Sequence, residues 1–485
     1  MSSKNDIDVI NDTVVNNDSV ETDFEPEIPE QRSIFKFINR PWVQVWLISF
    51  VAFCCPGMYN ALSGMGGSGQ VDPTIAANAS VALLSTGAAT GVFICGPLVT
   101  LIGPKWSLAL GSWAYALYSG GLLNYNHRQN GAFVIASGAI LGFCANLLWL
   151  PQGMIMTSYV KEEARGRAIA LFWVVFNLGG GIGALATFGL NYNSTSGTVN
   201  DSTYIAYMVI MLVGWVVGGL FICNPSQLSS KFHGERVSKI NQQHKEFLSF
   251  SKLKDTAVFT IKTLMNWRLL CILPMFFNAN VFYAYQQNYV NALTFNIRTR
   301  ALNSSLYWIA QMLGGFLIGM ILDLKYFKRN VRVVVGWGIL FVTAMVIWGG
   351  GYKFQVWSDA RIALGLKQDI DFKGDNYIGP MFLYFFYGMY DALFQSYCYW
   401  MIGVFAKTPS ESAILVGTYK TLQCVGGAMA WKVNAIKTPA MTQFAMNWGL
   451  TCGTLVVALP CVISFFREEQ KQVSLKDESE EKSDL

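Results

Sequence analysis

Residues 384–400 read YFFYGMYDALFQSYCYW, and Asp391 is the only charged residue among them. A run of this kind is typical of a helix that crosses a lipid bilayer, which requires about 20 mostly apolar residues. A charge in the middle of a membrane costs at least about 2.5–3.5 kcal/mol, so the carboxyl group of Asp391 should face protein or a water-filled cavity. The stretch therefore predicts a fold class and a first candidate for a functional site.

The composition of the whole chain agrees with this class. Of the 485 residues, 53% are hydrophobic and 13% are charged, whereas soluble proteins carry about 25% charged residues. The net charge of +5 is spread over loops without a basic stripe, so we expect no nucleic-acid partner. Cysteines and histidines show no metal-ligand spacing, and we expect no metal and no other cofactor.

Comparable apolar segments recur along the chain and predict about twelve membrane-spanning helices. We place them near residues 42–63, 74–102, 106–124, 132–159, 166–190, 204–223, 267–291, 301–322, 333–351, 377–404, 410–434 and 442–466. The expected fold is all-α and polytopic, with two pseudo-symmetric six-helix bundles. The expected domains are a disordered acidic tail (1–40), a first bundle (41–223), a cytoplasmic linker (224–266), a second bundle (267–466) and a charged cytoplasmic tail (467–485).

Lysine and arginine gather in the short loops of one side, which is therefore expected to be cytoplasmic, together with both termini. The sequences Asn193-Ser194-Thr195 and Asn200-Asp201-Ser202 lie in a loop predicted on the other side, and each is a glycosylation acceptor motif. We expect an integral multi-pass protein of the plasma membrane or of an endomembrane such as the endoplasmic reticulum.

Lys420 is a second charged residue inside an apolar run, at residues 415–425. Asp391 lies roughly 20 Å and Lys420 roughly 15 Å from the predicted inner ends of consecutive helices, at a rise of about 1.5 Å per residue. We expect both side chains at similar depth, either paired or facing a cavity together. One interpretation is a site that binds a solute or carries a proton. The other is a structural ion pair that fixes two neighbouring helices.

Uncharged polar residues inside the spans supply further candidates for a solute or ion pathway. They are Asn60, Asn146, Gln152 and Asn177 in the first half and Gln286 and Gln287 in the second. Transporter sites lie near the membrane midplane between repeats, which favours such a role. The alternative is hydrogen bonding between helices, worth about 0.6 kcal/mol per contact.

The two halves repeat several features in the same order, as expected for a duplicated chain. Asn60-Ala61-Leu62 corresponds to Asn291-Ala292-Leu293, Asn146 to Asp391, and Gly179-Gly180 to Gly426-Gly427. Close helix packing is the expected reason for the glycines of 179–183. Gly96 with Gly103-Pro104-Lys105 corresponds to Gly319 with Asp323 and Lys328-Arg329.

This arrangement resembles the major facilitator superfamily, whose loop between helices two and three reads roughly Gly-x-Leu-x-Asp-Arg-x-Gly-Arg-Lys. The chain has Gly96, Leu98, Gly103 and Lys105 at matching positions, but Thr100, Leu101 and Pro104 replace the aspartate and both arginines. The second-half copy keeps Gly319, Asp323, Lys325, Lys328 and Arg329. The resemblance implies that these loops, with Arg165 and Arg167, gate the cytoplasmic face, and that half of the usual latch is missing.

A narrower resemblance is to the fungal branch of the uncoordinated-93-like (Unc-93-like) membrane proteins. It is carried by CPGMYNAL at 55–62, by Arg165-Gly166-Arg167 with Phe172-Trp173, and by FNIRTRALN at 295–303. This family includes proteins thought to transport or regulate ion flux and proteins thought to escort partners. The resemblance therefore leaves two functions open.

The leading expectation is a transporter that moves a small solute or ion across a membrane by alternating access. The alternative is a non-transporting accessory protein that regulates or escorts another membrane protein. An enzyme is not expected, because the apolar segments carry no nucleophile–base constellation. Expected partners are the lipid bilayer, an unidentified solute or ion and, in the alternative, a membrane protein.

Overall fold

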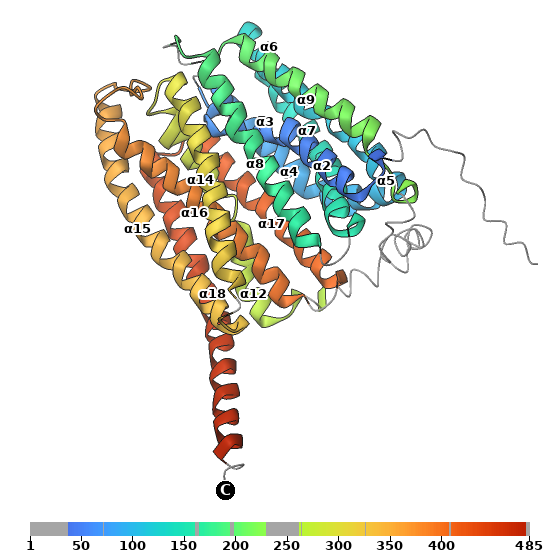
Figure 1. Cartoon of the computed structure of the whole chain (residues 1–485). Helices are drawn as coiled ribbons and strands as arrows, with labels where there is room; N and C mark the ends of the chain where they lie inside the picture. The colour runs from blue at the N-terminus through green and yellow to red at the C-terminus, as the bar shows by residue number, and fades with distance from the viewer. Residues whose placement is uncertain are drawn as a thin grey trace, which may run out of the picture.

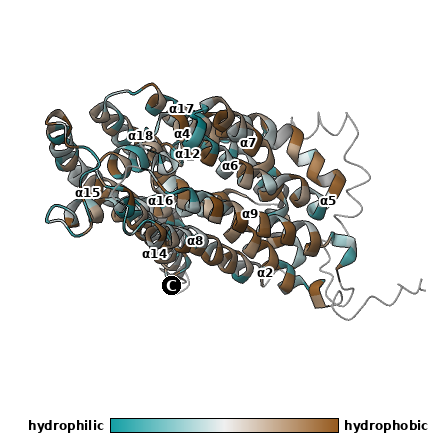
Figure 2. Cartoon of the chain, turned by 90° about the horizontal axis from the view of Figure 1, so that it is seen from above, coloured by the Kyte–Doolittle hydropathy of each residue, from teal (hydrophilic) through white to brown (hydrophobic). Residues whose placement is uncertain are grey.

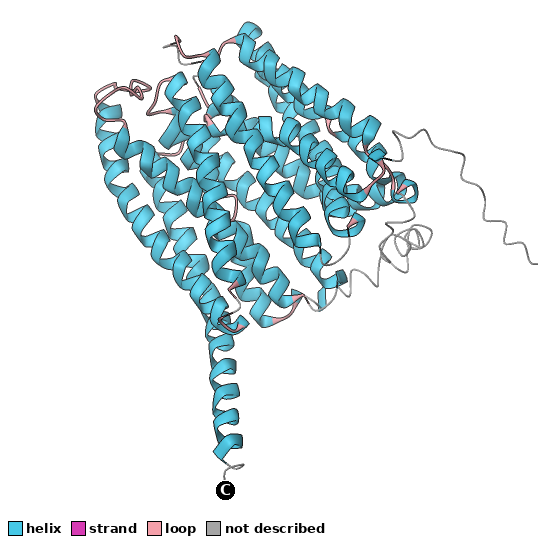
Figure 3. Ribbon diagram, in the orientation of Figure 1, coloured by secondary structure: helices cyan, strands magenta, loops and turns pink. Residues whose placement is uncertain are grey.

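The computed structural model describes residues 37–70, 72–160, 164–194, 198–228, 261–262, 264–324, 326–406 and 409–481. These residues are almost wholly helical (Figure 3), and the strand-like pairing among them is a single bridge between Phe295 and Ile370. Eight helical stretches of this part are each long and apolar enough to cross a membrane. The all-α membrane fold is therefore confirmed. Most of the predicted tail 1–40 and of the predicted linker 224–266 lies outside the described residues.

The first half consists of straight helices joined by short π-helical turns. The helices are α2 (Pro41–Ala52), α3 (Met58–Gly64), α4 (Thr74–Thr90), α5 (Gly96–Gly111), α6 (Trp113–Arg128), α7 (Gly131–Met154), α8 (Arg165–Leu190) and α9 (Asp201–Phe221), and the turns are η1 (Phe53–Gly57), η3 (Gly91–Cys95) and η4 (Ile155–Tyr159). Gly103 has a φ of 80° inside α5. Glycine adopts this left-handed conformation without steric cost, and here it separates the second predicted span from the third.

The second half repeats this plan with longer helices. Its elements are α12 (Trp267–Asn278), α13 (Phe282–Tyr285), η8 (Gln286–Ala292), α14 (Ile297–Asp323), α15 (Arg329–Ala363), α16 (Ile378–Phe405), α17 (Pro409–Ala435) and α18 (Ala440–Glu481). Two helices extend past the predicted spans 333–351 and 442–466, although the apolar part of α18, Ala440–Glu468, agrees with the second of these spans. The helix α15 continues well beyond residue 351 and α18 well beyond 466, because neither extension contains a proline or glycine that would stop it.

Each half has its own hydrophobic core, and the halves meet along two helix pairs. In Figure 1, α2, α5, α6 and α9 lie on one side of the molecule, α12, α15, α16 and α18 lie on the other, and α18 extends beyond the bundle. Across the boundary α4 packs on α17 and α8 packs on α14. The second and fifth spans of one half thus meet the fifth and second of the other, as a pseudo-two-fold relation requires.

The outer surface is suited to lipid. In Figure 2 the helices of both halves are mostly coloured as hydrophobic, and hydrophilic residues are prominent in the connection that follows α15. Large apolar side chains such as Leu220, Phe316 and Val346 are exposed on this surface. Water-soluble folding would leave these side chains in water, whereas a bilayer covers them.

The glycines of α8 allow the backbone of neighbouring helices to approach closely. A Cβ atom on Gly179 would lie 2.5 Å from the carbonyl oxygen of Phe53, and one on Gly180 would lie 3.0 Å from the ring of Trp308 in the other half. Gly189, on the same helix, has no atom within 4 Å of such a position. The structure thus supports close packing as the reason for this glycine string.

We expect Gly179→Ala to lower the free energy of unfolding by about 1–3 kcal/mol, because the added methyl group meets a backbone atom that cannot turn away. Gly189→Ala is the matched control on the same helix and should cause no loss. Thermal and denaturant unfolding of both purified variants in one detergent checks this. Equal destabilisation by the two variants would contradict the packing argument.

Candidate functional site

Arg300, in the first turn of α14, joins the two halves at the end of the bundle that carries Asn193. Its side chain is fully buried. The guanidinium donates hydrogen bonds to the carbonyl oxygens of Met65 at 2.8 Å, Gly66 at 2.5 Å and Gln70 at 3.2 Å. These carbonyls follow the end of α3, where the chain turns, and the Gly66 carbonyl also accepts from the Gly69 amide at 3.1 Å. One buried cation therefore completes the end of a helix in the opposite half.

Further side chains of the second half bond to the same segment of the first half. Asn291 Nδ2 and the Tyr384 hydroxyl donate to the Gly64 carbonyl at 2.9 and 2.7 Å. Trp308 Nε1 donates to the Asn60 carbonyl at 3.1 Å, and Asn288 Oδ1 accepts from the Gly67 amide at 2.8 Å. We call Arg300, these four side chains and segment 60–70 the outer seal. Most of the hydrogen bonds that join described residues of the two halves lie at this end of the bundle, and the bond from Ser305 Oγ to the Gly181 carbonyl at 3.0 Å lies farther along α14 and α8.

Arg298 adds a link at the rim of the outer seal. It donates to Asp371 Oδ2 at 2.6 Å and to the Tyr192 carbonyl of the first half at 2.8 Å. Partial burial acts to raise the pKa of Asp371, but hydrogen bonds from Arg298 and Asn296 outweigh it and hold the pKa below the ordinary value of 3.8. This carboxylate therefore stabilises the fold above its ordinary pKa, and the contribution is lost as pH falls through the lowered value.

Asp391 lies within the second half, on α16, and its side chain is fully buried. Gln286 Nε2 donates to Asp391 Oδ1 at 3.1 Å, and the Tyr307 hydroxyl contacts Oδ2. The same hydroxyl lies 2.7 Å from Gln286 Oε1. The expectation that this carboxyl faces protein holds, and the surrounding groups are uncharged.

Lys420, on α17, is half-buried and faces the first half. Its Nζ donates to Gln423 Oε1 at 3.2 Å and lies 5.6–5.7 Å from the ring centroids of Trp149, Tyr399 and Tyr419. Trp149 belongs to α7 of the first half. Contacts of this kind are worth about 0.5–2 kcal/mol each. They position the ammonium at the boundary between the halves.

The predicted ion pair of Asp391 with Lys420 is not formed. Among the described residues, neither side chain takes part in a salt bridge. The reason is the direction that each helix presents: Asp391 points toward η8 and α14, whereas Lys420 points across the boundary toward α7. Similar depth in the membrane did not bring the two charges together.

A chain of uncharged side chains extends from Lys420 into the second half. Gln423 Nε2 donates to Gln395 Oε1 at 3.1 Å, and Gln395 Nε2 donates to the Tyr283 hydroxyl at 2.8 Å. Gln311 Nε2 donates to the same hydroxyl at 3.1 Å. Sequence analysis missed these glutamines, although Asp391, Gln395 and Tyr399 recur every four residues and so share one helix face.

Two of the other five predicted pathway residues have side-chain partners among the described residues. Asn146 Nδ2 donates to the Gly87 carbonyl at 3.0 Å, and Asn177 Nδ2 donates to the Trp173 carbonyl at 2.9 Å. The Asn146 bond joins α7 to α4 and favours the helix-packing interpretation for that amide, whereas the Asn177 bond stays within α8. Gln152 is half-buried, and Gln287 is buried with its Oε1 unpartnered among the described residues.

The predicted gating loops lie at the end opposite the outer seal. Lys105 bonds within its own half, where its backbone amide donates to Asn224 Oδ1 at 3.2 Å and its Nζ donates to the Leu220 carbonyl at 3.4 Å. Arg167, Asp323, Lys328 and Arg329 are exposed, whereas the side chains of Arg165 and Lys325 lie outside the described part. A gating role for these residues stays a prediction.

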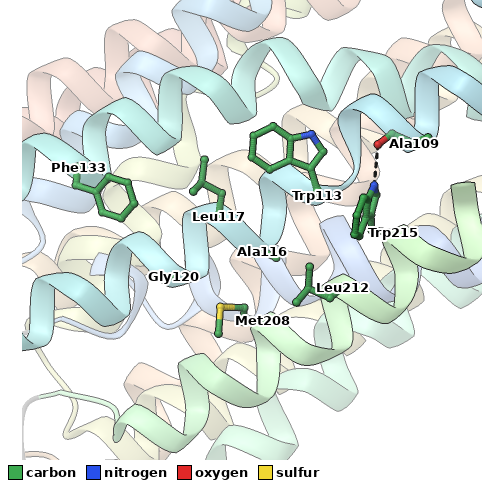
Figure 4. A pocket seen from close by; sticks show the side chains of 9 residues that line it. All are labelled: Ala109, Trp113, Ala116, Leu117, Gly120, Phe133, Met208, Leu212 and Trp215. Atoms are coloured by element: carbon green, nitrogen blue, oxygen red, sulfur yellow. Dashed lines mark hydrogen bonds between the residues drawn. The ribbon is translucent and has the colours of Figure 1, made fainter.

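An apolar groove between α6 and α9 is a different kind of feature (Figure 4). Its lining residues are Ala109, Trp113, Ala116, Leu117, Gly120, Phe133, Met208, Leu212 and Trp215. Trp215 Nε1 donates to the Ala109 carbonyl at 2.7 Å, which leaves no polar side chain free to orient a solute. Specific small-molecule sites need a few placed polar groups, so the candidate site is the boundary around Lys420.

A model of the Major Facilitator Superfamily matches residues 34–430. UNC93-like protein C922.05c of Schizosaccharomyces pombe is 42% identical over 424 residues, which cover 86% of this chain and 81% of the relative. UNC93-like protein 1 of Arabidopsis thaliana is 41% identical over 428 residues, which cover 88% and 90%.

Solved structures of transporters share the fold. The POT family transporter PepTSo has a TM-score of 0.61 at 11% identity, with 87% of this chain and 98% of that chain covered. The partially occluded inward-open xylose transporter XylE from E. coli has a TM-score of 0.57 at 12% identity, with 90% and 98% covered. At these identities the likeness concerns the fold alone.

The Tyr307 hydroxyl should contribute to stability because it satisfies the buried carboxyl of Asp391. We expect Tyr307→Phe to lower the free energy of unfolding by about 1–3 kcal/mol, the usual cost of an unsatisfied buried polar group. Tyr390→Phe is the matched control: its ring is equally buried, and its hydroxyl lacks a partner among the described residues. Unfolding curves of the two variants should separate clearly. Coincident curves would mean that the Tyr307 contact adds nothing.

Proposed function

Because this chain belongs to the major facilitator superfamily and to its UNC93-like proteins, we propose that it moves a small solute or ion across a membrane by alternating access. The observation that carries the proposal is the outer seal. Among the described residues, most hydrogen bonds between the halves lie at one end of the bundle, around the buried Arg300. A protein closed at one end in this way corresponds to one of the two states that alternating access requires.

The hydrogen bonds of the outer seal can break when the two halves move apart. Arg300 binds backbone carbonyls, which are uncharged acceptors. Water can replace each of these bonds at modest net cost, because typical hydrogen bonds contribute about 0.5–1.5 kcal/mol and those to charged groups about 1.5–3 kcal/mol. Rocking of the halves would exchange protein partners for water without leaving a bare charge in lipid.

Lys420 supplies the proposed contact with the solute. Its ammonium lies near Trp149 of the first half and Tyr399 of the second, so a solute bound there would touch both moving parts. Lys420 is eleven residues from the start of α17, roughly 16 Å at a rise of about 1.5 Å per residue. This depth corresponds to the middle of a bilayer about 30 Å thick, the usual position of transporter sites.

Asp391 has a separate role in the proposal. It does not face the boundary between the halves, and Gln286 connects it to the segment that forms part of the outer seal. We assign it to coupling: gain or loss of a proton at this carboxyl would alter its bonds with Gln286 and Tyr307. Asn60, Gln152 and Gln287 are retained as pathway residues, on polarity and position.

The proposed orientation follows the loop charges, with the outer seal facing the outside or an organelle lumen and both termini in the cytoplasm. Asn193 and Asn200 are exposed at the sealed end, as their use as glycosylation sites would require. The domain limits remain as proposed from the sequence, with bundles at 41–223 and 267–466. Either the plasma membrane or the endoplasmic reticulum fits this orientation.

Uptake by proteoliposomes tests the function. Vesicles carrying the full chain are incubated with a mixture of amino acids, sugars, organic acids and nucleosides, and retained solutes are identified by mass spectrometry. We expect at least one solute to accumulate, and Lys420→Met to reduce its uptake to the background of empty vesicles because the charge that binds it is gone. Lys432→Met, an exposed lysine on the same helix, is the control and should transport normally.

Normal uptake by a folded Lys420→Met protein would refute the assigned site. Absence of uptake of every solute, together with a membrane protein that co-purifies in fixed stoichiometry from cells expressing the chain at native level, would instead favour the accessory function. This second function is favoured by one feature of the first gating loop. The aspartate and the two arginines of the family motif are replaced there by Thr100, Leu101 and Pro104.

Arg300→Gln should loosen the outer seal, since the shorter neutral side chain cannot reach three carbonyls. We expect a cysteine placed at the buried Ser304 to react at least about tenfold faster with a membrane-impermeant maleimide added on the sealed side, given about 1.5–3 kcal/mol per hydrogen bond to a charge. The control Arg128→Gln removes an exposed arginine from the same end. Should Arg300→Gln not fold, Tyr384→Phe, which removes one seal bond, replaces it. Unchanged labelling in a folded variant would exclude a gating role.

A further inference from the structure

The charge of Lys420 is not balanced by the protein in the part that the structure describes. Its Nζ has one hydrogen-bond acceptor, Gln423 Oε1, and an ammonium has three donors. The three rings around it attract the cation through their faces but accept no conventional hydrogen bond. A half-buried, uncompensated cation at this depth in a membrane is completed by an anion.

Tyr283 offers a second donor close to the same chain of side chains. Its hydroxyl oxygen accepts from Gln395 and from Gln311, so its own hydrogen remains available, and no acceptor for it occurs among the described residues. The Gln395 and Gln423 amides separate Tyr283 from Lys420 and are already engaged. The two open donors lie at opposite ends of this chain of amides, so a single carboxylate reaches only the one at Lys420.

The walls beside Lys420 are aromatic and come from both halves. Trp173 of the first half meets Tyr399 of the second at 6.3 Å between ring centroids, and Trp149 meets Phe176 at 5.4 Å. Trp149, Trp173 and Tyr399 are each partly exposed, so ring edges and faces are available to a ligand. Such walls favour a flat apolar body over a sugar or an amino acid with a short polar side chain.

From these contacts we propose that the boundary site binds a small monocarboxylate with a ring, with the carboxylate on Lys420 and the ring among Trp149, Trp173 and Tyr399. This deepens the proposed function and rests on it. The single cation selects one negative charge, because a second carboxylate would be desolvated without a partner. A ligand with a positive charge would be repelled by the same ammonium, and a neutral amide would leave it uncompensated.

The test measures binding to the purified full chain in detergent by thermal stabilisation and by tryptophan fluorescence. The probes are benzoate, its neutral counterpart benzamide, the cation benzylammonium, the dianion terephthalate and acetate, which lacks the ring. We expect benzoate to bind at least about tenfold more tightly than the other four, since it alone satisfies both parts of the site. Lys420→Met should weaken benzoate binding to the level of benzamide, whereas Lys420→Arg should retain most of it.

Two further variants separate a binding role from a structural one. Tyr283→Phe, at the far end of the chain of amides, and the exposed-lysine control Lys432→Met should both leave benzoate and benzamide binding unchanged. Benzamide or benzylammonium binding as tightly as benzoate would overturn the proposal, as would equal losses in Lys420→Met and Lys432→Met. Absence of benzoate binding to the unmodified chain would overturn it as well.

Uptake by the same preparations distinguishes failure of this inference from failure of transport. A chain that accumulates another solute in vesicles but ignores benzoate refutes the carboxylate class and leaves the transporter intact. A chain that binds benzoate through Lys420 yet moves no solute confirms the site and refutes transport.

Discussion

A backbone carbonyl that leaves a helix inside a membrane must find a donor, and this structure satisfies that requirement across the boundary between its halves. The chain turns sharply after α3, and the carbonyls of Met65, Gly66 and Gln70 receive their hydrogen bonds from Arg300. While the outer seal is closed these carbonyls are buried away from water, and each one left without a donor would cost about 1–3 kcal/mol. Ending one helix is therefore inseparable from holding the two halves together at one face of the membrane.

The two charges in the membrane interior obey the same rule in different ways. Asp391 is satisfied within its own half, by Gln286 and Tyr307. The Lys420 ammonium lies near aromatic rings of both halves and donates to one amide oxygen. Its other N–H groups have no acceptor among the described residues. The carboxyl of Asp391 has its partners within the protein, whereas the ammonium of Lys420 has room for a further partner. This contrast, more than the presence of charge, separates the coupling candidate from the binding candidate.

The sequence predicted the architecture because bilayer thickness fixes the length of an apolar run, and the break at Gly103 fell where two runs meet. It did not predict where α15 and α18 end, since hydropathy indicates where an apolar run ends and not where a helix ends. The depth of Asp391 and Lys420 was accessible by counting residues, but their directions depend on how α16 and α17 rotate against their neighbours. The spacing of four residues between Asp391, Gln395 and Tyr399 indicates the polar face of α16, but the sequence analysis did not draw on it.

Arg300 escaped sequence analysis for a different reason. A cation at the end of an apolar run resembles an ordinary interfacial residue, and its acceptors are backbone carbonyls, which carry no side-chain signature. The resemblance to Unc-93-like proteins included this position within FNIRTRALN, but as a family marker without a role. Its function emerges only when the turn after α3 and the start of α14 are seen in contact.

The π-helical segment η8 carries both systems on seven consecutive residues. Gln286, its first residue, bonds to Asp391, while Asn288 and Asn291 bond to Gly67 and Gly64 of the opposite half. A π-helical turn holds one residue more than an α-helical turn, and such turns are frequent at functional sites. Linkage between two equilibria is reciprocal. If a change of protonation at Asp391 weakens the outer seal through this segment, opening of the seal must shift the protonation equilibrium of Asp391 by the same free energy. The opening of the outer seal and the protonation of Asp391 would then each depend on the other.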